Sequence, residues 1–259
     1  MQPAVLNPVP RWRVVAEEQF RAVGLALRRE ALAAAGLVTL ATLWMGYVQV
    51  NSLRDLEVPL APEAGVPAAI LALLVPMAVW KGEGPARRGY HRAMPVSHAF
   101  HAIARSLSGL VWLLAAVALY FVWLAGASAM TGGEVDAVYG WQWVVPFTGA
   151  AVMYLLGSAL TLATTHPWRW LGGAFVAYMF LGAVRVAEGT ASLFDSVNVV
   201  ITGTLGLRTV VTGFSPSEYL YHHYGHTTAD ASVWLAATWL WLAIAVTAFA
   251  WAAFRQPER

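Results

Sequence analysis

Histidines are the residues of this chain that first suggest a chemical site. His222 and His226 lie four residues apart, so on a helix both side chains would project from one face and could bind a metal ion together. A catalytic zinc needs a third ligand and an activated water, and Gly225 weakens a helix here. The alternative is a polar, aromatic stretch at a membrane surface. We expect no metal site, with His222 and His226 as the only candidate ligands.

The residues needed by common catalytic classes are missing. The chain has no cysteine, which excludes disulfides, thiolate metal sites and cysteine nucleophiles. Its single lysine, Lys81, lies outside any G-x-x-x-x-G-K-[ST] loop, so we do not expect the chain to hydrolyse ATP. Ser108-Gly109 lacks the first glycine of a G-x-S-x-G motif. We therefore predict that the chain is not an enzyme and holds no cofactor of its own.

Composition indicates where such a chain resides. Of its 259 residues, 59% are apolar and 12% are charged, whereas soluble domains carry roughly 25% charged residues. Sixteen basic residues against fourteen acidic ones give a net charge of +2, too balanced for a nucleic-acid-binding protein. Thirteen tryptophans and nine tyrosines fit the aromatic belts at bilayer surfaces. These features are typical of an all-α polytopic membrane protein.

Apolar runs predict the membrane-crossing helices. A bilayer core of about 30 Å requires about 20 apolar helical residues. We expect six spans within a transmembrane domain of residues 31–254, at 31–50, 66–80, 106–131, 143–165, 170–184 and 232–254. The second is short and contains Pro67 and Pro76, so its length alone would also fit a re-entrant segment.

The distribution of charge favours six spans with both termini in the cytoplasm. That topology places 13 of the basic residues inside and 3 outside, in agreement with the positive-inside rule. It also places 5 acidic residues inside and 9 outside. If 66–80 did not span, the basic loop that follows it would lie outside. Residues 255–259 form a cytoplasmic tail in this prediction.

Residues 1–30 are predicted to form a cytoplasmic amphipathic helix rather than a signal peptide. Trp12, Phe20 and Val23 fall on one helical face, whereas Arg13 and Arg21 fall on the other. Such a helix lies in the membrane interface. It serves either as an anchor or as a contact for a cytosolic partner, and Glu17 is spaced to pair with Arg21.

Residues 82–101 form a longer loop than a simple helix reversal needs. Pro95 marks a new start and Ser97 is a suitable N-cap, so we expect a short cytoplasmic helix before the third span. The arginines of this loop either hold it at an anionic lipid surface or belong to a docking element for another protein.

Residues 187–231 are the second irregular region. Their middle is apolar, but it contains three glycines and Arg208, so a plain span is not expected. We predict one or two short re-entrant or interfacial helices on the outer side, with Arg185 and Glu188 spaced to pair at the membrane edge. The spans hold almost no ionisable side chains, so transport through them would take its energy from elsewhere.

The loop carries a family resemblance. Glu83-Gly84, followed by Arg92-Ala93-Met94-Pro95-Val96-Ser97, resembles the loop between spans two and three of ABC-2 type transporter permeases. These are the membrane subunits of ATP-binding cassette exporters, and the predicted architecture resembles theirs over nearly the whole chain. The sequence departs from the family at His98, where Arg or Lys is common.

The resemblance implies a permease that forms the substrate pathway as a dimer with a second copy or a homologue. Separate ABC ATPase subunits would bind ATP and Mg, and the loop would contact them as a coupling helix. It implies a multi-pass protein of a bacterial or archaeal cytoplasmic membrane, in contact with lipid and not with nucleic acid. The alternatives are a non-transporting membrane scaffold that binds a cytosolic partner through the basic loop and a membrane enzyme with an outer histidine site. The ATPase-contact residues under this resemblance are Glu83, Arg87, Arg88, Arg92, Pro95, Val96 and Ser97, and the outer gate candidates are Arg185, Glu188 and Arg208.

Overall fold

A computed structural model describes residues 11–51, 57–81, 97–135, 139–188, 192–216 and 226–255 of the chain. These residues are mostly helical, which confirms the all-α prediction apart from one short two-stranded ribbon. Five helical segments among them are long and apolar enough to cross a membrane, as expected of a membrane protein. They are Arg28–Gln49, Pro62–Trp80, Ala99–Thr131, Gly140–Ala163 and Ala231–Arg255.

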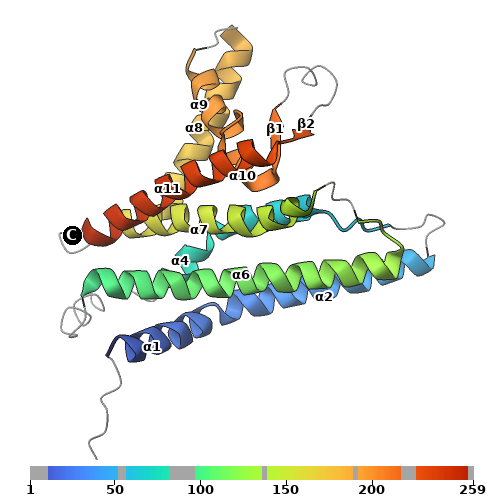
Figure 1. Cartoon of the computed structure of the whole chain (residues 1–259), viewed down its shortest axis with the longest axis horizontal. Helices are drawn as coiled ribbons and strands as arrows, with labels where there is room; N and C mark the ends of the chain where they lie inside the picture. The colour runs from blue at the N-terminus through green and yellow to red at the C-terminus, as the bar shows by residue number, and fades with distance from the viewer. Residues whose placement is uncertain are drawn as a thin grey trace, which may run out of the picture.

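Helix α7 (Val145–Ala163) is the centre of the packing. Helix α11 (Ala231–Arg255), helix α6 (His98–Thr131) and the short helices α3 (Val66–Ala72) and α10 (Leu207–Thr212) all pack against it. Helices α6, α7 and α11 run lengthwise in Figure 1. Small residues on α7 let its neighbours approach closely. At Gly157, for example, any Cβ would overlap the carbonyl group of Leu73. The 3-10 turn η2 (Gly140–Val144) leads into α7.

The second expected span is helical but broken. It consists of η1 (Pro62–Gly65), α3 (Val66–Ala72) and α4 (Val75–Trp80). Leu73 and Leu74 form turns between α3 and α4 with 3-10-type hydrogen bonds to Ile70 and Leu71. Pro76 has no N–H to donate, so it lies at the start of the new helix instead of inside a continuous one.

Helices α1 (Arg11–Ala26) and α2 (Arg28–Asn51) follow one another along α6 (Figure 1). Backbone hydrogen bonds continue past Leu27, from its N–H to Val23 and from Ala31 to Leu27. Helix α1 is the predicted amphipathic helix, and Val23 on its apolar face is fully buried. The predicted Glu17–Arg21 pairing is replaced by an exposed Arg21–Glu18 contact of 4.0 Å.

The third expected span begins earlier in the structure than the sequence predicted. Ser97 caps a single helix, α6, which runs unbroken for 34 residues to the left-handed Gly132. The short separate helix expected before this span is therefore part of α6 as far as it falls within the described residues. The helix is about 51 Å long at 1.5 Å per residue, well beyond a 30 Å bilayer core.

Helix α8 (Pro167–Glu188) covers the fifth expected span but is not one of the five segments named above. In Figure 1, α8 and α9 (Ser192–Thr202) rise away from the lengthwise helices. The Tyr178 hydroxyl donates to Asn198 Oδ1 at 3.1 Å and joins α8 to α9. Helix α10 (Leu207–Thr212) follows, and strands β1 (Phe214–Pro216) and β2 (His226–Thr228) then pair antiparallel.

Candidate functional site

The predicted ATPase-contact loop leaves the described part of the chain at Lys81 and re-enters it at Ser97. Six of its seven candidate residues lie outside the described residues, namely Glu83, Arg87, Arg88, Arg92, Pro95 and Val96. Ser97 is described, and it is the N-cap of α6 as predicted. Its hydroxyl oxygen accepts a hydrogen bond from the Phe100 N–H at 3.3 Å.

Arg105 lies two turns after Ser97 and joins three helices. Its side chain is only 7% exposed. Nε and Nη2 both donate to the Val79 carbonyl oxygen on α4, at 3.1 and 2.6 Å, and Nη1 donates to Gln19 Oε1 on α1 at 3.1 Å. We call these residues, together with Trp80, the Arg105 junction. The Val79 carbonyl lies in the last turn of α4, which ends at Trp80, and it accepts two hydrogen bonds from the guanidinium.

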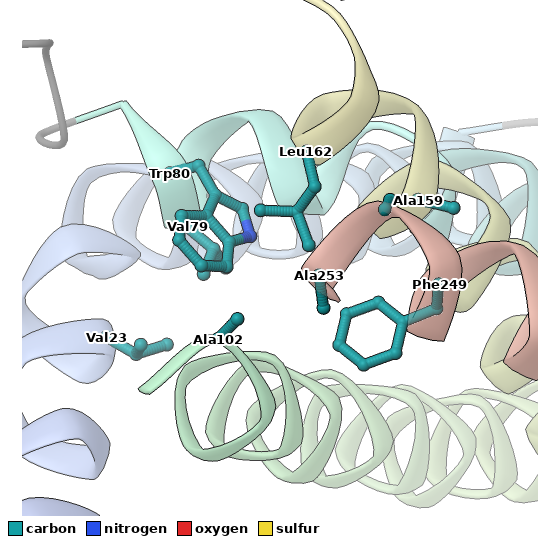
Figure 2. Close-up of a cluster of buried hydrophobic side chains, with 9 residues drawn as sticks. Val23, Val79, Trp80, Ala102, Ala159, Leu162, Phe249 and Ala253 are labelled. Carbon is teal, nitrogen blue, oxygen red and sulfur yellow. The ribbon is translucent and has the colours of Figure 1, made fainter. Parts of the chain in front are cut away.

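Aromatic and aliphatic side chains surround this guanidinium. Its central carbon lies 5.4 Å from the ring centre of Trp80, within cation–π range. Figure 2 shows the adjoining cluster, in which Val23, Val79, Ala102, Leu162 and Phe249 converge. They come from α1, α4, α6, α7 and α11 respectively, so five helices meet beside the two ends of the loop.

Helix α1 is held to α6 by a second contact, about two turns beyond Arg105 along α6. The rings of Phe20 and Trp112 stack with centres 5.1 Å apart, and Trp112 Nε1 donates to the Phe20 carbonyl at 3.3 Å. Gly24 lies directly under the Trp112 ring, where a Cβ would approach to 3.0 Å. An aromatic pair of this kind is worth about 0.5–1.5 kcal/mol beyond its buried area. Together with the Arg105–Gln19 bond, it fixes α1 against α6.

The chemistry of the junction is that of a mechanical linkage. Its groups are a cation, a carbonyl, an amide and apolar rings, and none of them is a nucleophile or a general base. Breaking the hydrogen bonds to Val79 and Gln19 would weaken the compensation of a buried charge, which is unfavourable. A displacement of the end of α4 or of the start of α6 is therefore expected to move both of these helices and α1 together.

The outer gate candidates occupy a different part of the fold. Arg185 and Glu188 lie in the last turn of α8, where the structure describes the backbone but not the side chains. Arg208 lies half-buried on α10. This helix packs on the first half of α7, next to Gly149, whereas the Arg105 junction adjoins the last half of α7 through Leu162.

The two candidate metal ligands do not share a helix. His226 begins strand β2, opposite Pro216, so it does not lie on the helical face considered for a shared metal site. His222 lies outside the described residues. Within the described ranges, no group of three or more His, Asp or Glu residues comes together as a potential metal site.

Sequence reasoning missed Gln19 and treated Arg105 only as a topological charge. The available signal was an arginine at the start of a long apolar run, two turns after a capping serine. No family model, no curated protein and no solved structure matches the chain. The case for its function therefore depends on these contacts and on the loop motif.

Proposed function

We propose that the chain is the membrane subunit of an ATP-binding cassette exporter of the ABC-2 type. Two copies, or this chain and a homologue, form the substrate pathway, and separate ATPase subunits bind ATP and Mg. The ATPases contact residues Glu83, Arg87, Arg88, Arg92, Pro95, Val96 and Ser97. Loop 82–101 then transmits ATPase closure to the helices as rigid-body motion.

The Arg105 junction is the observation that carries the proposal. The loop departs from the end of α4 and returns at the start of α6, and Arg105 bonds these two helices to each other and to α1. A partner that pulls on the loop therefore acts on a tied group of helices, not on a flexible connection.

The proposed topology has six spans, with α8 as the fifth and both termini in the cytoplasm. At 22 residues α8 is about 33 Å long, enough to cross a bilayer core. Helices α9 and α10 are then re-entrant or interfacial helices on the outer side, with Arg185, Glu188 and Arg208 near the exit. The natural absence of cysteine allows a direct test by single cysteines at exposed His166 and Asp230. Six spans place residue 166 inside and residue 230 outside, whereas five spans place both on the same side.

The second copy is proposed to lie against α2. The membrane-length part of α2 has no buried residue within one chain, although Thr42 accepts a hydrogen bond from Trp123 at one edge. A single cysteine at exposed Gly36 or Gly46, where a new side chain meets no neighbour, should form a disulfide between two copies in the membrane. A single cysteine in place of exposed Phe175 on α8 provides a comparison, since it tests disulfide formation from another exposed helix.

Purification under mild detergent extraction tests the proposal. We expect a partner chain with a G-x-x-x-x-G-K-[ST] motif to accompany the protein and to hydrolyse ATP. A stable chain that never retains such a partner would contradict the proposal. Retention of a cytosolic protein without this motif would instead support the alternative of a non-transporting scaffold.

A further inference from the structure

A groove runs between α1 and α6 on the surface next to the Arg105 junction. Its volume is about 530 Å³, and Trp12, Ala16, Phe20, Phe100, Leu107 and Val111 are among the residues that line it. The groove is mostly apolar, yet its side chains are not covered by the rest of the chain, since Leu107 and Val111 are each 54% exposed. Its charged lining comes from Glu17 and Arg21, one helical turn apart on α1.

The length of α6 places this groove at the membrane surface. A bilayer core takes about 20 of the 34 residues of α6, counted from its end at Thr131. The groove uses the opposite third of the helix, from Phe100 to Val111. An exposed apolar groove at that depth lies at the level of the lipid headgroups, and its Val111 end adjoins the acyl chains of the core.

The two charges select a particular headgroup. Residues at i and i+4 on a helix have Cβ atoms about 5–6 Å apart, which suits a headgroup that carries a phosphate and an ammonium group side by side. Arg21 can hold the phosphate as a charge-assisted hydrogen-bond donor, and Glu17 can accept from a primary ammonium. The contact between Arg21 and Glu18 is exposed and 4.0 Å long, so it competes little for the guanidinium.

We propose that this groove is a binding site for one phosphatidylethanolamine molecule, with the headgroup between Arg21 and Glu17 and the acyl chains passing Val111 into the bilayer core along α6. A wholly anionic headgroup has no ammonium group for Glu17 to accept from, and its negative charge would lie next to this carboxylate. A choline headgroup offers Glu17 no hydrogen-bond donor. The site depends only on the chain residing in a membrane and not on its assignment as an exporter subunit.

Native mass spectrometry of the delipidated full-length protein tests this site. The protein is offered equal concentrations of phosphatidylethanolamine, phosphatidylglycerol and phosphatidylcholine with the same acyl chains. We expect one tightly held phosphatidylethanolamine per chain, bound about tenfold more tightly than either competitor, since one well-formed charged contact corresponds to about that factor. Equal retention of all three lipids, or preference for phosphatidylglycerol, would overturn the proposal.

Matched variants separate the headgroup contacts from the groove. Arg21→Gln and Glu17→Gln alter exposed side chains and should each remove the preference, whereas Arg29→Gln on exposed α2 should keep it. Ala16→Phe fills the groove and should abolish the tightly held lipid, whereas Ala33→Phe on the exposed face of α2 should not. Unchanged lipid binding in Arg21→Gln and Ala16→Phe would refute the site. So would strong binding that develops only after removal of residues 1–10, because that segment would then be the occupant in the intact chain.

Discussion

Replacing Arg105 with methionine tests the junction at its central residue. Methionine keeps much of the apolar stem but removes all three hydrogen bonds to Val79 and Gln19. The buried Val79 carbonyl then loses both guanidinium donors, at a cost of about 1–3 kcal/mol, and the half-buried Gln19 amide loses a charged donor. Removing a buried charge offsets part of this loss. We expect a net loss of about 2 kcal/mol in the free energy of unfolding.

Intrinsic tryptophan fluorescence during heating in detergent provides the assay. For a chain of this size, about 2 kcal/mol corresponds to a decrease in Tm of about 4–8 °C. The Tm of Arg105→Lys should lie between those of the natural protein and the methionine variant, because a lysine ammonium cannot reproduce the planar fork that serves Val79 and Gln19 together. Arg29→Met changes an exposed arginine and should shift Tm by no more than about 2 °C.

A double-mutant cycle with Gln19 identifies the source of the effect. If Arg105 acts through its bond to Gln19, Gln19→Ala will cost less in the Arg105→Met background than in the natural protein, with a coupling of at least about 0.5 kcal/mol. A methionine variant as stable as the natural protein would refute the reasoning. Strictly additive effects would refute the contribution of the Arg105–Gln19 bond.

Three further predictions concern neighbouring features. Gly109→Ala should lower the stability by about 1–3 kcal/mol in thermal unfolding, since the new Cβ would overlap the Tyr154 hydroxyl, and Tyr154→Phe should restore part of the loss because phenylalanine lacks the overlapping oxygen. Ser97→Ala should cost about 1 kcal/mol by removing the N-cap of α6, whereas Ser97→Asp should retain most of the stability in the same assay. Charge reversal at both Arg87 and Arg92 should lower ATP-driven transport into vesicles without reducing the amount of inserted protein measured by immunoblot, whereas reversal at exposed Arg29 should leave both unchanged.

Local sequence patterns were sufficient for most individual elements. Apolar runs marked five of the helices because hydrocarbon requires long segments with internally paired backbones. Ser97 was identified as an N-cap because its hydroxyl acts within three residues. Pro67 and Pro76 were noted in the second span, but the pattern did not show that α3 and α4 would be separate helices.

Long-range contacts were beyond those patterns. Arg105 reaches Val79 and Gln19, which are 26 and 86 residues away, and neither spacing leaves a periodic signal. His226 pairs with Pro216 in a two-stranded ribbon, so its spacing from His222 does not correspond to one face of a helix.

Site-specific crosslinking from the loop is the most direct test of the central claim that loop 82–101 contacts an ATPase. Because the chain has no cysteine, Arg88→Cys introduces a single attachment point for a photoreactive crosslinker in intact membranes. We predict a crosslinked product with a chain that carries a G-x-x-x-x-G-K-[ST] motif, and its loss when the probe is moved to Glu134 in the loop after α6. Crosslinks from residue 88 only to lipid, or to proteins without that motif, would contradict the account.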